Sequence, residues 1–209
     1  TVLQENMLGE VAAVSSFGAE AVVLLHLISR IDPALPVLFL ETGKHFPETL
    51  AYRDEVTALL GLTDVRSLTP DADAIKAKDE TGLRWSYDPD GCCEIRKVDS
   101  LGKKLFELDL WIAGMRRDQS NERSSTPLLS LAARPDNSDV WKLNPLVDWS
   151  REQVWAYLKE HDLPHNVLHD RGYRSIGCWP CTRAPKPGTD ARSGRWAGTD
   201  KTECGLHFD

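Results

Sequence analysis

A regular alternation of predicted strands and helices fills the first third of the chain and restricts its fold more than any other feature. Residues 10–15, 35–40 and 63–68 are predicted strands, the first two of them apolar runs typical of buried parallel strands. Residues 19–31 and 47–60 between them have the helical spacing, or the opening proline, of helices. This order predicts an α/β fold with an open, mostly parallel, twisted sheet flanked by helices.

The remaining elements are less regular. Residues 108–115 form another apolar run and are a predicted buried strand, and residues 140–143 are a predicted short edge strand. Residues 71–80 are expected to form an exposed helix, and Ser150 opens a further helix through a capping box. We expect a turn at residues 88–91.

Composition limits the partners. The chain has 209 residues and a formal net charge of −7, whereas a general nucleic-acid binder needs a basic face. No apolar run approaches the roughly 20 residues that a membrane span requires. Neither nucleic acid nor a membrane is therefore expected as a partner. The five cysteines indicate metal or redox chemistry rather than a secreted disulfide framework, so we infer a reducing cytoplasm.

Polar loops follow three of the predicted strands. Ligands of open parallel sheets bind at the carboxyl ends of the strands, so these loops are candidate binding segments. The first loop also offers free backbone N–H groups and a helix N-terminus to an anion, although turns of this composition are common. The candidate residues are Ser15, Ser16, Phe17 and Gly18 in the first loop, Glu41, Thr42 and Gly43 in the second, and Arg116 in the third.

Four of the five cysteines form two pairs, Cys92-Cys93 and Cys178-Trp-Pro-Cys181. Four thiolates suit a tetrahedral zinc ion or a [4Fe–4S] cluster. Adjacent cysteines make a strained disulfide, and their diverging side chains do not form a zinc knuckle, but they can reach two corners of a larger cluster. The spacing favours iron–sulfur and leaves zinc open.

Cys204 is left over, and it lies just before a glycine and a histidine. An unpaired thiol in this position is a candidate nucleophile, and the alternative is a spare cysteine on a frayed end. Residues 182–202 show little apolar periodicity and are rich in glycine and proline, which predicts a mobile lid that orders on its ligand. We therefore expect a nucleotide-binding domain over residues 1–181, which carries the four cysteines, and a flexible tail over residues 182–209.

Six motifs together resemble one family, the phosphoadenylyl-sulfate (PAPS) reductases, and within it the iron–sulfur branch of assimilatory adenylyl-sulfate (APS) reductases. The likeness covers nearly the whole chain. The motifs are Ser15-Ser-Phe-Gly-Ala-Glu20, Glu41-Thr-Gly-Lys-His-Phe-Pro47, Cys92-Cys93-Glu-Ile-Arg-Lys97, Gly114-Met-Arg-Arg-Asp-Gln119, Gly172-Tyr-Arg-Ser-Ile-Gly-Cys178-Trp-Pro-Cys181 and Glu203-Cys-Gly-Leu-His207. The chain has Glu41 where the family commonly has aspartate, a conservative change.

The resemblance implies a nucleotide α-hydrolase-like fold related to the ATP pyrophosphatases. It implies a [4Fe–4S] cluster on the four paired cysteines, which we expect to order the site rather than to carry electrons. It also implies thioredoxin-dependent reduction of APS to sulfite and AMP in sulfate assimilation and cysteine biosynthesis. In this reaction Cys204 attacks the sulfur, AMP leaves, and thioredoxin releases sulfite from the S-sulfonated cysteine. The family's basic residues and the histidine beside the nucleophile map onto Lys97, Arg123, Arg192, Arg195 and His207.

Other functions are less consistent with the sequence. A PAPS reductase or a dual APS/PAPS reductase remains the main alternative. An ATP pyrophosphatase of the same fold would need a Ser-Gly-Gly-x-Asp-Ser loop, from which Phe17 and Glu20 depart. A non-enzymatic nucleotide-binding metal module would leave Cys204 unexplained. The sequence leaves open whether the chain forms a homo-oligomer.

Overall fold

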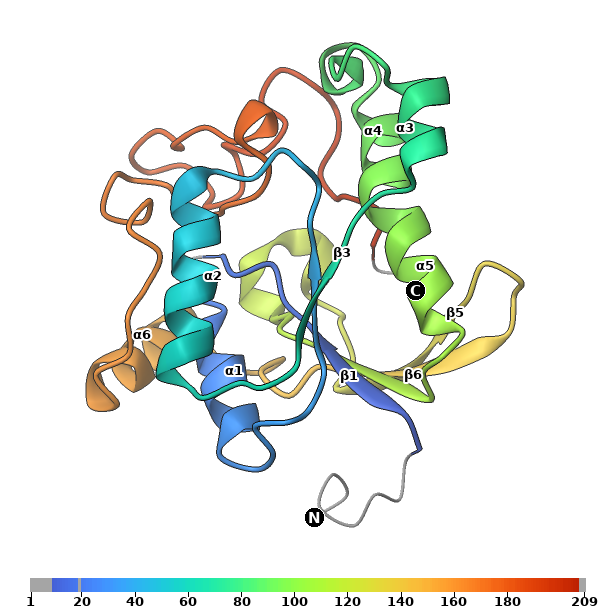
Figure 1. Cartoon of the computed structure of the whole chain (residues 1–209). Coiled ribbons are helices and arrows are strands. Elements are labelled where there is room, and N and C mark those ends of the chain that lie inside the picture. Colours follow the sequence, from blue (N-terminus) through green and yellow to red (C-terminus); the bar gives the residue numbers. More distant parts are fainter. Residues whose placement is uncertain (1–8, 19, 207–209) are drawn as a thin grey trace.

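The computed structural model describes residues 9–18 and 20–206, and this part of the chain contains one six-stranded sheet of order β3-β2-β1-β4-β6-β5 (Figure 1). All neighbouring strands are parallel except β5, which pairs antiparallel with β6. The predicted open, mostly parallel α/β sheet is confirmed. The strands are β1 (Val11–Val14), β2 (Val37–Leu40), β3 (Val65–Leu68), β4 (Leu110–Ala113), β5 (Leu129–Ala133) and β6 (Asp139–Leu143).

Helices cover both faces of the sheet. Figure 1 shows α1, α2 and α6 on one side and α3, α4 and α5 on the other. None of the helices in the part of the chain that the structure describes has the length and apolar character to cross a membrane. The helices are α1 (Val22–Ser29), α2 (Pro47–Leu59), α3 (Ala72–Lys78), α4 (Pro89–Cys93), α5 (Asp99–Leu105) and α6 (Arg151–Glu160), with a π-helical turn at Glu94–Val98 and 3₁₀ turns at Arg84–Ser86, Arg117–Gln119, Asn121–Arg123 and Trp179–Cys181.

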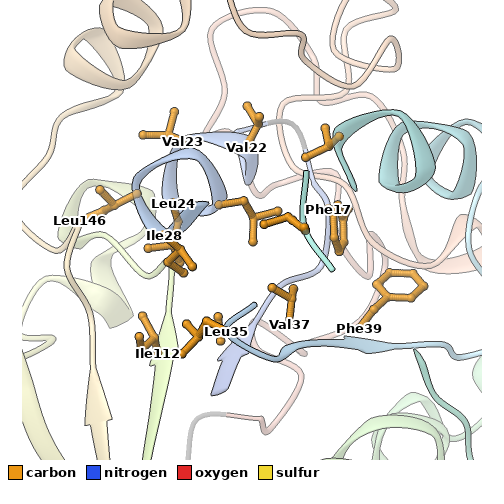
Figure 2. Close-up of a cluster of buried hydrophobic side chains, with 14 of the residues drawn as sticks. Phe17, Val22, Val23, Leu24, Ile28, Leu35, Val37, Phe39, Ile112 and Leu146 are labelled. Atoms are coloured by element: carbon orange, nitrogen blue, oxygen red, sulfur yellow. The ribbon is translucent and has the colours of Figure 1, made fainter. Parts of the chain in front are cut away.

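Strand β2 is buried on both faces because helices cover the two sides of the sheet. Its alternate residues Val37 and Phe39 point into the larger apolar cluster, shared with α1, α2 and α6 (Figure 2). Leu38 and Leu40 point the other way, into a second cluster shared with α5. This two-sided burial explains why the strand reads as a continuous apolar run in the sequence.

The strand order reverses direction between β1 and β4. From β1 the chain proceeds outward through β2 to β3, and then returns to add β4 on the opposite side of β1. The carboxyl ends of β1 and β4 therefore flank a topological switch point, the place where open α/β sheets bind ligands.

The sequence prediction for the far edge of the sheet is wrong. Strand β6, predicted as an edge strand, lies between β4 and β5, and β5 itself was not predicted. Leu129 and Leu131 of β5 are each 50% exposed, whereas Ala132 is buried. This pattern of exposed large and buried small side chains is not the alternation by which half-buried strands are recognised.

The predicted turn at residues 88–91 is also wrong, because these residues begin a helix. The Asp88 side chain caps helix α4 by accepting the Gly91 N–H at 2.9 Å, and Pro89 occupies the first helical position. The helix continues through the π-helical turn into α5. Cys92 and Cys93 therefore lie on a helix, directly before a π-turn of the kind that often marks functional sites.

Candidate active site

A cavity of about 260 Å³ lies at the carboxyl ends of β1 and β4, at the switch point of the sheet. The loops after these two strands form one wall, and the C-terminal part of the chain forms another. Nine of the residues that the sequence analysis selected line this one cavity. They are Ser15, Ser16, Gly18, Lys97, Arg116, Arg123, Arg192, Arg195 and Cys204.

Phe17 is the member of the first loop that does not line the cavity. Its φ of +45° is left-handed, and its side chain is fully buried edge-on to Phe39, with ring centroids 5.6 Å apart. The Ser15 hydroxyl accepts the N–H of Phe17 at 3.2 Å, which pins the turn. Packing in the core therefore holds the Phe17 side chain, and the predicted role of this loop residue in substrate binding stays a prediction.

The second loop, Glu41 to Gly43, is not part of the lining of this cavity, and its predicted role in substrate binding stays a prediction. Thr42 is fully buried, and its Oγ1 lies 3.3 Å from the Sγ of Cys178. The Thr42 carbonyl accepts a hydrogen bond from Nη1 of Arg96 at 2.7 Å. The Glu41 carboxylate accepts the N–H of Gly43 at 2.8 Å. The loop therefore supports the four-cysteine site.

The four paired cysteines meet at a second, smaller cavity. Cys92 and Cys93 come from the end of α4. Cys178, which bridges to His45, directly precedes the 3₁₀ turn, and Cys181 is the last residue of that turn. The thiols are free, and only Cys181 is more than slightly exposed. The structure thus brings together the four cysteines that the sequence paired.

The spread of these sulfur atoms tests which group the cysteines fit. A zinc ion with Zn–S bonds of about 2.3 Å holds four thiolates roughly 3.8 Å apart. Among the described residues, two histidines and an aspartate form a compact group in which all three ligand atoms lie within 4.8 Å of one another. The cysteines do not form such a compact group. Sulfurs spread around a cavity fit a larger group better than a single ion.

The compact group is His165, His169 and Asp170, and its contacts are structural. His165 pairs with Asp170 at 2.8 Å, and both histidine rings pack on Trp155 with centroids 5.1 and 4.3 Å away. Nη2 of Arg151 lies 3.0 Å from Nε2 of His169. A guanidinium donor in this position occupies the nitrogen lone pair and adds positive charge, and both effects oppose a cation there.

Lys97 is a buried cation between the two cavities, both of which it lines. Burial acts to lower the pKa of Lys97, but the negative charges of Cys178, Cys204 and Cys93 outweigh it and hold the pKa above its usual range. Burial likewise acts to raise the pKa of Cys178, and the charge of Lys97 and the Thr42 hydrogen bond bring it below the usual value. Lys97 therefore stays charged and stabilises anions on both sides.

Arg195 also lines both cavities. Its guanidinium stacks 4.4 Å from the Trp196 ring centroid, and its Nε is buried without a partner among the described residues. A Cβ on Gly177 would lie 2.3 Å from Nη2 of Arg195. The glycine before Cys178 is therefore required for the guanidinium to approach so closely.

Arg116 and Arg123 line the cavity but are already paired with carboxylates. Nη1 of Arg116 lies 2.6 Å from Glu20, and its Nε lies 2.9 Å from Asp118. Arg123 binds Glu203 through two nitrogens, at 2.7 and 2.8 Å. Their proposed contacts with substrate compete with these ion pairs.

The sequence analysis missed two side chains of the tail, Lys201 and Glu203. The Lys201 side chain is 7% exposed and pairs with Asp90, and its Nζ lies 5.4 Å from the ring centroid of Trp196. Glu203 lines the cavity beside Cys204. Glu203 opens the last of the six motifs and Lys201 lies two residues before it, but nothing in the sequence indicates the partners of either side chain. His207, the remaining predicted catalytic residue, lies outside the described residues.

Residues 182–202 contain no helix or strand among the described residues, as their composition predicts. The segment nevertheless packs on the rest of the chain, whereas its composition predicted a mobile lid. Thr182 is 1% exposed and Trp196 is 4% exposed, and an antiparallel bridge joins Thr182 to Arg195. A single buried indole and arginine side chains supply this packing, and neither produces apolar periodicity. The closing of this segment on a ligand stays a prediction.

The fold and site together define an α/β protein with an open, mostly parallel sheet, a four-cysteine site and a thiol in a cavity at the switch point of the sheet. Residues 10–184 match the model of the phosphoadenosine phosphosulfate reductase domain. The adenosine 5'-phosphosulfate reductase of Mesorhizobium japonicum is 46% identical over 200 residues, which cover 95% of this chain and 76% of that protein. The phosphoadenosine 5'-phosphosulfate reductase of Gloeobacter violaceus is 44% identical over 196 residues, which cover 92% of this chain and 80% of that protein.

Two solved structures are similar to this fold. The PAPS reductase of Candida auris, in its phosphate complex, has a TM-score of 0.69 and 26% identity, over 87% of this chain and 88% of that one. The FMN adenylyltransferase of Candida glabrata shares the fold alone, with a TM-score of 0.62 and 19% identity, over 84% of this chain and 57% of that one.

The chain belongs to the phosphoadenosine phosphosulfate reductase family. The predicted family, the fold relationship and the assignment as an oxidoreductase of this family are confirmed.

Proposed function

We propose that this chain catalyses the thioredoxin-dependent reduction of APS to sulfite and AMP in the cytoplasm, as a step of sulfate assimilation. One observation carries the proposal: the unpaired thiol of Cys204 shares a cavity at the switch point of the sheet with Lys97, Arg192 and Arg195. An anion held by these cations lies next to a nucleophile. The choice of substrate is supported by the relatives named APS reductases, to which this chain is 41–46% identical.

Substrate binding divides between the cations and the polar walls. The sulfate and phosphate oxygens of APS would contact Lys97, Arg192 and Arg195, which suit them in charge and, for the arginines, in fork geometry. His45 also lines the cavity, and its Nε2 contacts the Leu40 carbonyl at 2.8 Å, so its Nδ1 is an acceptor. This Nδ1 is buried without a partner among the described residues, and a ribose hydroxyl or the adenine amino group would donate to it.

The chemistry proceeds in three displacements on sulfur. The Cys204 thiolate attacks the sulfuryl sulfur, an S–S bond forms, the S–O bond to the phosphate breaks, and AMP leaves with the electron pair. The cations offset the repulsion between the two anions and the charge that develops on the leaving phosphate. A thioredoxin thiolate then attacks Sγ of Cys204 and expels sulfite, and the second thioredoxin thiol resolves the mixed disulfide, which regenerates the Cys204 thiol.

Cys92, Cys93, Cys178 and Cys181 would hold a [4Fe–4S] cluster, which would supply a fixed charge distribution beside Lys97. The donor set of four free thiols and the spread of their sulfur atoms support this assignment over zinc. Iron, acid-labile sulfide and zinc should be measured in anaerobically purified protein. We expect iron and sulfide in nearly equal amounts, and stoichiometric zinc without sulfide would contradict the assignment.

PAPS is the second candidate substrate, because the relative from Gloeobacter violaceus is named a PAPS reductase and is about as similar as the APS reductases. Sulfite release with thioredoxin should be compared for APS and PAPS at equal concentration. We expect faster release from APS. Equal or faster turnover of PAPS would overturn the preference, and release from neither would overturn the proposed function.

A further inference from the structure

Glu203 places its carboxylate between two arginines of the cavity. Its Oε1 accepts a hydrogen bond from Nε of Arg123 at 2.7 Å. Its Oε2 accepts hydrogen bonds from Nη2 of Arg123 at 2.8 Å and from Nη2 of Arg192 at 2.9 Å. The pair with Arg123 is bidentate, the geometry in which a guanidinium binds a carboxylate most strongly. The residue next to Cys204 is therefore clamped to the wall of the cavity.

Every nitrogen of Arg123 already donates one hydrogen bond within the protein once this pair has formed, which leaves two of its five N–H groups without a bond of this kind. Its third nitrogen, Nη1, donates to Oε1 of Gln119 at 2.6 Å, and the side chain is about nine-tenths buried. Arg192 differs, because its hydrogen bonds to the tail, to Glu203 and to the Thr202 carbonyl, use Nη2 alone. Nε and Nη1 of Arg192 have no recorded partner among the described residues, so Arg192 can bind the tail and an anion together.

Glu203 is also the counter-ion that lets the two arginines coexist. Burial and the positive charge of Arg123 lower the pKa of Arg192 to about 10, and the charge of Glu203 opposes this. Burial acts to raise the pKa of Glu203, but Arg123 and then Arg192 lower it overall. Removing the carboxylate would leave two partly buried cations facing each other, which is costly. The tail is thus bound by charge rather than by secondary structure.

We propose that Glu203 is a positioning residue that fixes Cys204 in the cavity, and that Arg123 acts through Glu203 instead of contacting the substrate. Adjacent residues have Cα atoms only about 3.8 Å apart, so an ion pair at Glu203 restricts Cys204 directly. Lys201 gives the tail a second anchor at Asp90. The oxyanions of the substrate are then left to Lys97, Arg192 and Arg195. This inference rests on the proposed function, because the positioned thiol is its nucleophile.

A double-mutant cycle tests whether Arg123 works through Glu203. Arg123→Gln, Glu203→Gln and the double variant should be compared with wild type for the single-turnover rate of Cys204 S-sulfonation at saturating APS. We expect each single variant to be slower by about tenfold, which is 1.4 kcal/mol, and the double to be no slower than the slower single. AMP affinity should change less than about twofold. Multiplicative losses, or weakened AMP binding in Arg123→Gln with an unchanged saturated rate, would overturn the proposal.

A second readout needs no substrate. Hydrogen exchange of the peptide covering residues 200–206 should rise in Glu203→Gln and in Arg123→Gln. Asp200→Asn, which removes an exposed carboxylate from the same tail, should match wild type. Glu203→Asp keeps the carboxylate and should retain most of the protection. Exchange that is equal in wild type, Glu203→Asp and Glu203→Gln would overturn the positioning role. If the tail loosens as expected and wild type forms no adduct with APS, the proposed function fails and the positioning role stands.

Discussion

The four-cysteine site and the tail that carries Cys204 are built by different kinds of interaction. Cys92 and Cys93 lie on a capped helix, and Cys178 is buried against Thr42. Cys204 belongs to no helix or strand, and the segment before it is held by ion pairs of Lys201 and Glu203.

This difference agrees with the proposed role of each site. A site that held the proposed cluster would have to keep four sulfurs in fixed positions, and buried elements with satisfied hydrogen bonds provide that rigidity. A thiol with the role proposed for Cys204 would have to be exposed first to a bound substrate and then to a protein reductant. A few ion pairs hold such a segment in one place and still allow it to open at modest cost.

The largest expected effect comes from removing the thiol of the tail. Cys204→Ser should abolish sulfite release, because a hydroxyl at neutral pH is not a comparable nucleophile. Iron content and AMP affinity should match wild type, because the four-cysteine site does not include this residue. Steady-state sulfite release measures the loss of activity, and iron analysis and equilibrium AMP binding measure the properties that should not change. Residual turnover above the level without enzyme would show that another group attacks the sulfur.

The second effect concerns the rigidity behind the cysteines. Asp79 is 2% exposed, and it pairs with Nη2 of Arg96 at 2.6 Å, while Arg96 holds the Thr42 carbonyl. Asp79→Asn leaves a buried guanidinium uncompensated and should lower the free energy of unfolding by about 3 kcal/mol at pH 7. Denaturant titration measures this loss of unfolding free energy. Asp64→Asn, which breaks the exposed pair with Arg66, should cost less than about 1 kcal/mol. Equal losses in the two variants would contradict the comparison.

The same pair predicts a pH dependence. Burial acts to raise the pKa of Asp79, but its bonds to Arg96 and the Arg84 N–H lower it below the ordinary 3.8. A depressed folded-state pKa stabilises the protein above pH 3.8 and loses that contribution as the pH falls through the lower value. The stability gap between wild type and Asp79→Asn should therefore narrow in strong acid. A stability difference that widened below pH 3.8 would show that the pKa of Asp79 is raised in the folded protein and not lowered.

A smaller effect is expected where the two cavities meet. Gly177→Ala should displace the guanidinium of Arg195, because the new Cβ would lie 2.3 Å from its Nη2. We expect KM for APS to rise by about tenfold, the effect of one weakened charge-assisted contact of about 1.4 kcal/mol. As a control, Gly177→Ala should be introduced into Arg195→Ala, where it should leave KM nearly unchanged. The same rise in both backgrounds would mean that Gly177 acts through another neighbour.

Thr42→Val should have the smallest effect. It keeps the side-chain volume but removes the hydroxyl 3.3 Å from the Sγ of Cys178. A net loss of about 1 kcal/mol of stability is expected, together with faster bleaching of cluster absorbance in air. Thr57→Val, which removes a partly buried hydroxyl that donates to the Arg53 carbonyl within α2, is a control for bleaching. An equal rate of bleaching in Thr42→Val and wild type would show that the hydroxyl does not stabilise the cysteine site.

Much of this comparison could be predicted from the sequence, and the rest depends on long-range contacts. The strand–helix alternation predicted the sheet because β1, β2 and β4 are buried on both faces, and their apolar runs record that burial. The cysteine pairs and Cys204 were identifiable because their chemistry is rare. The pairing of Glu203 with Arg123, which are 80 positions apart, leaves no local pattern. The same applies to Phe17, whose burial depends on Phe39 and not on its own polar loop.

The most direct test of the account is the mass of the protein after incubation with APS under anaerobic conditions and without thioredoxin. The account predicts an adduct with the mass of one SO₃, mapped by peptide analysis to Cys204, which thioredoxin then removes with release of sulfite. Cys204→Ser should remain unmodified in parallel. No adduct, or an adduct on one of the other four cysteines, would contradict the assignment of Cys204 as the nucleophile.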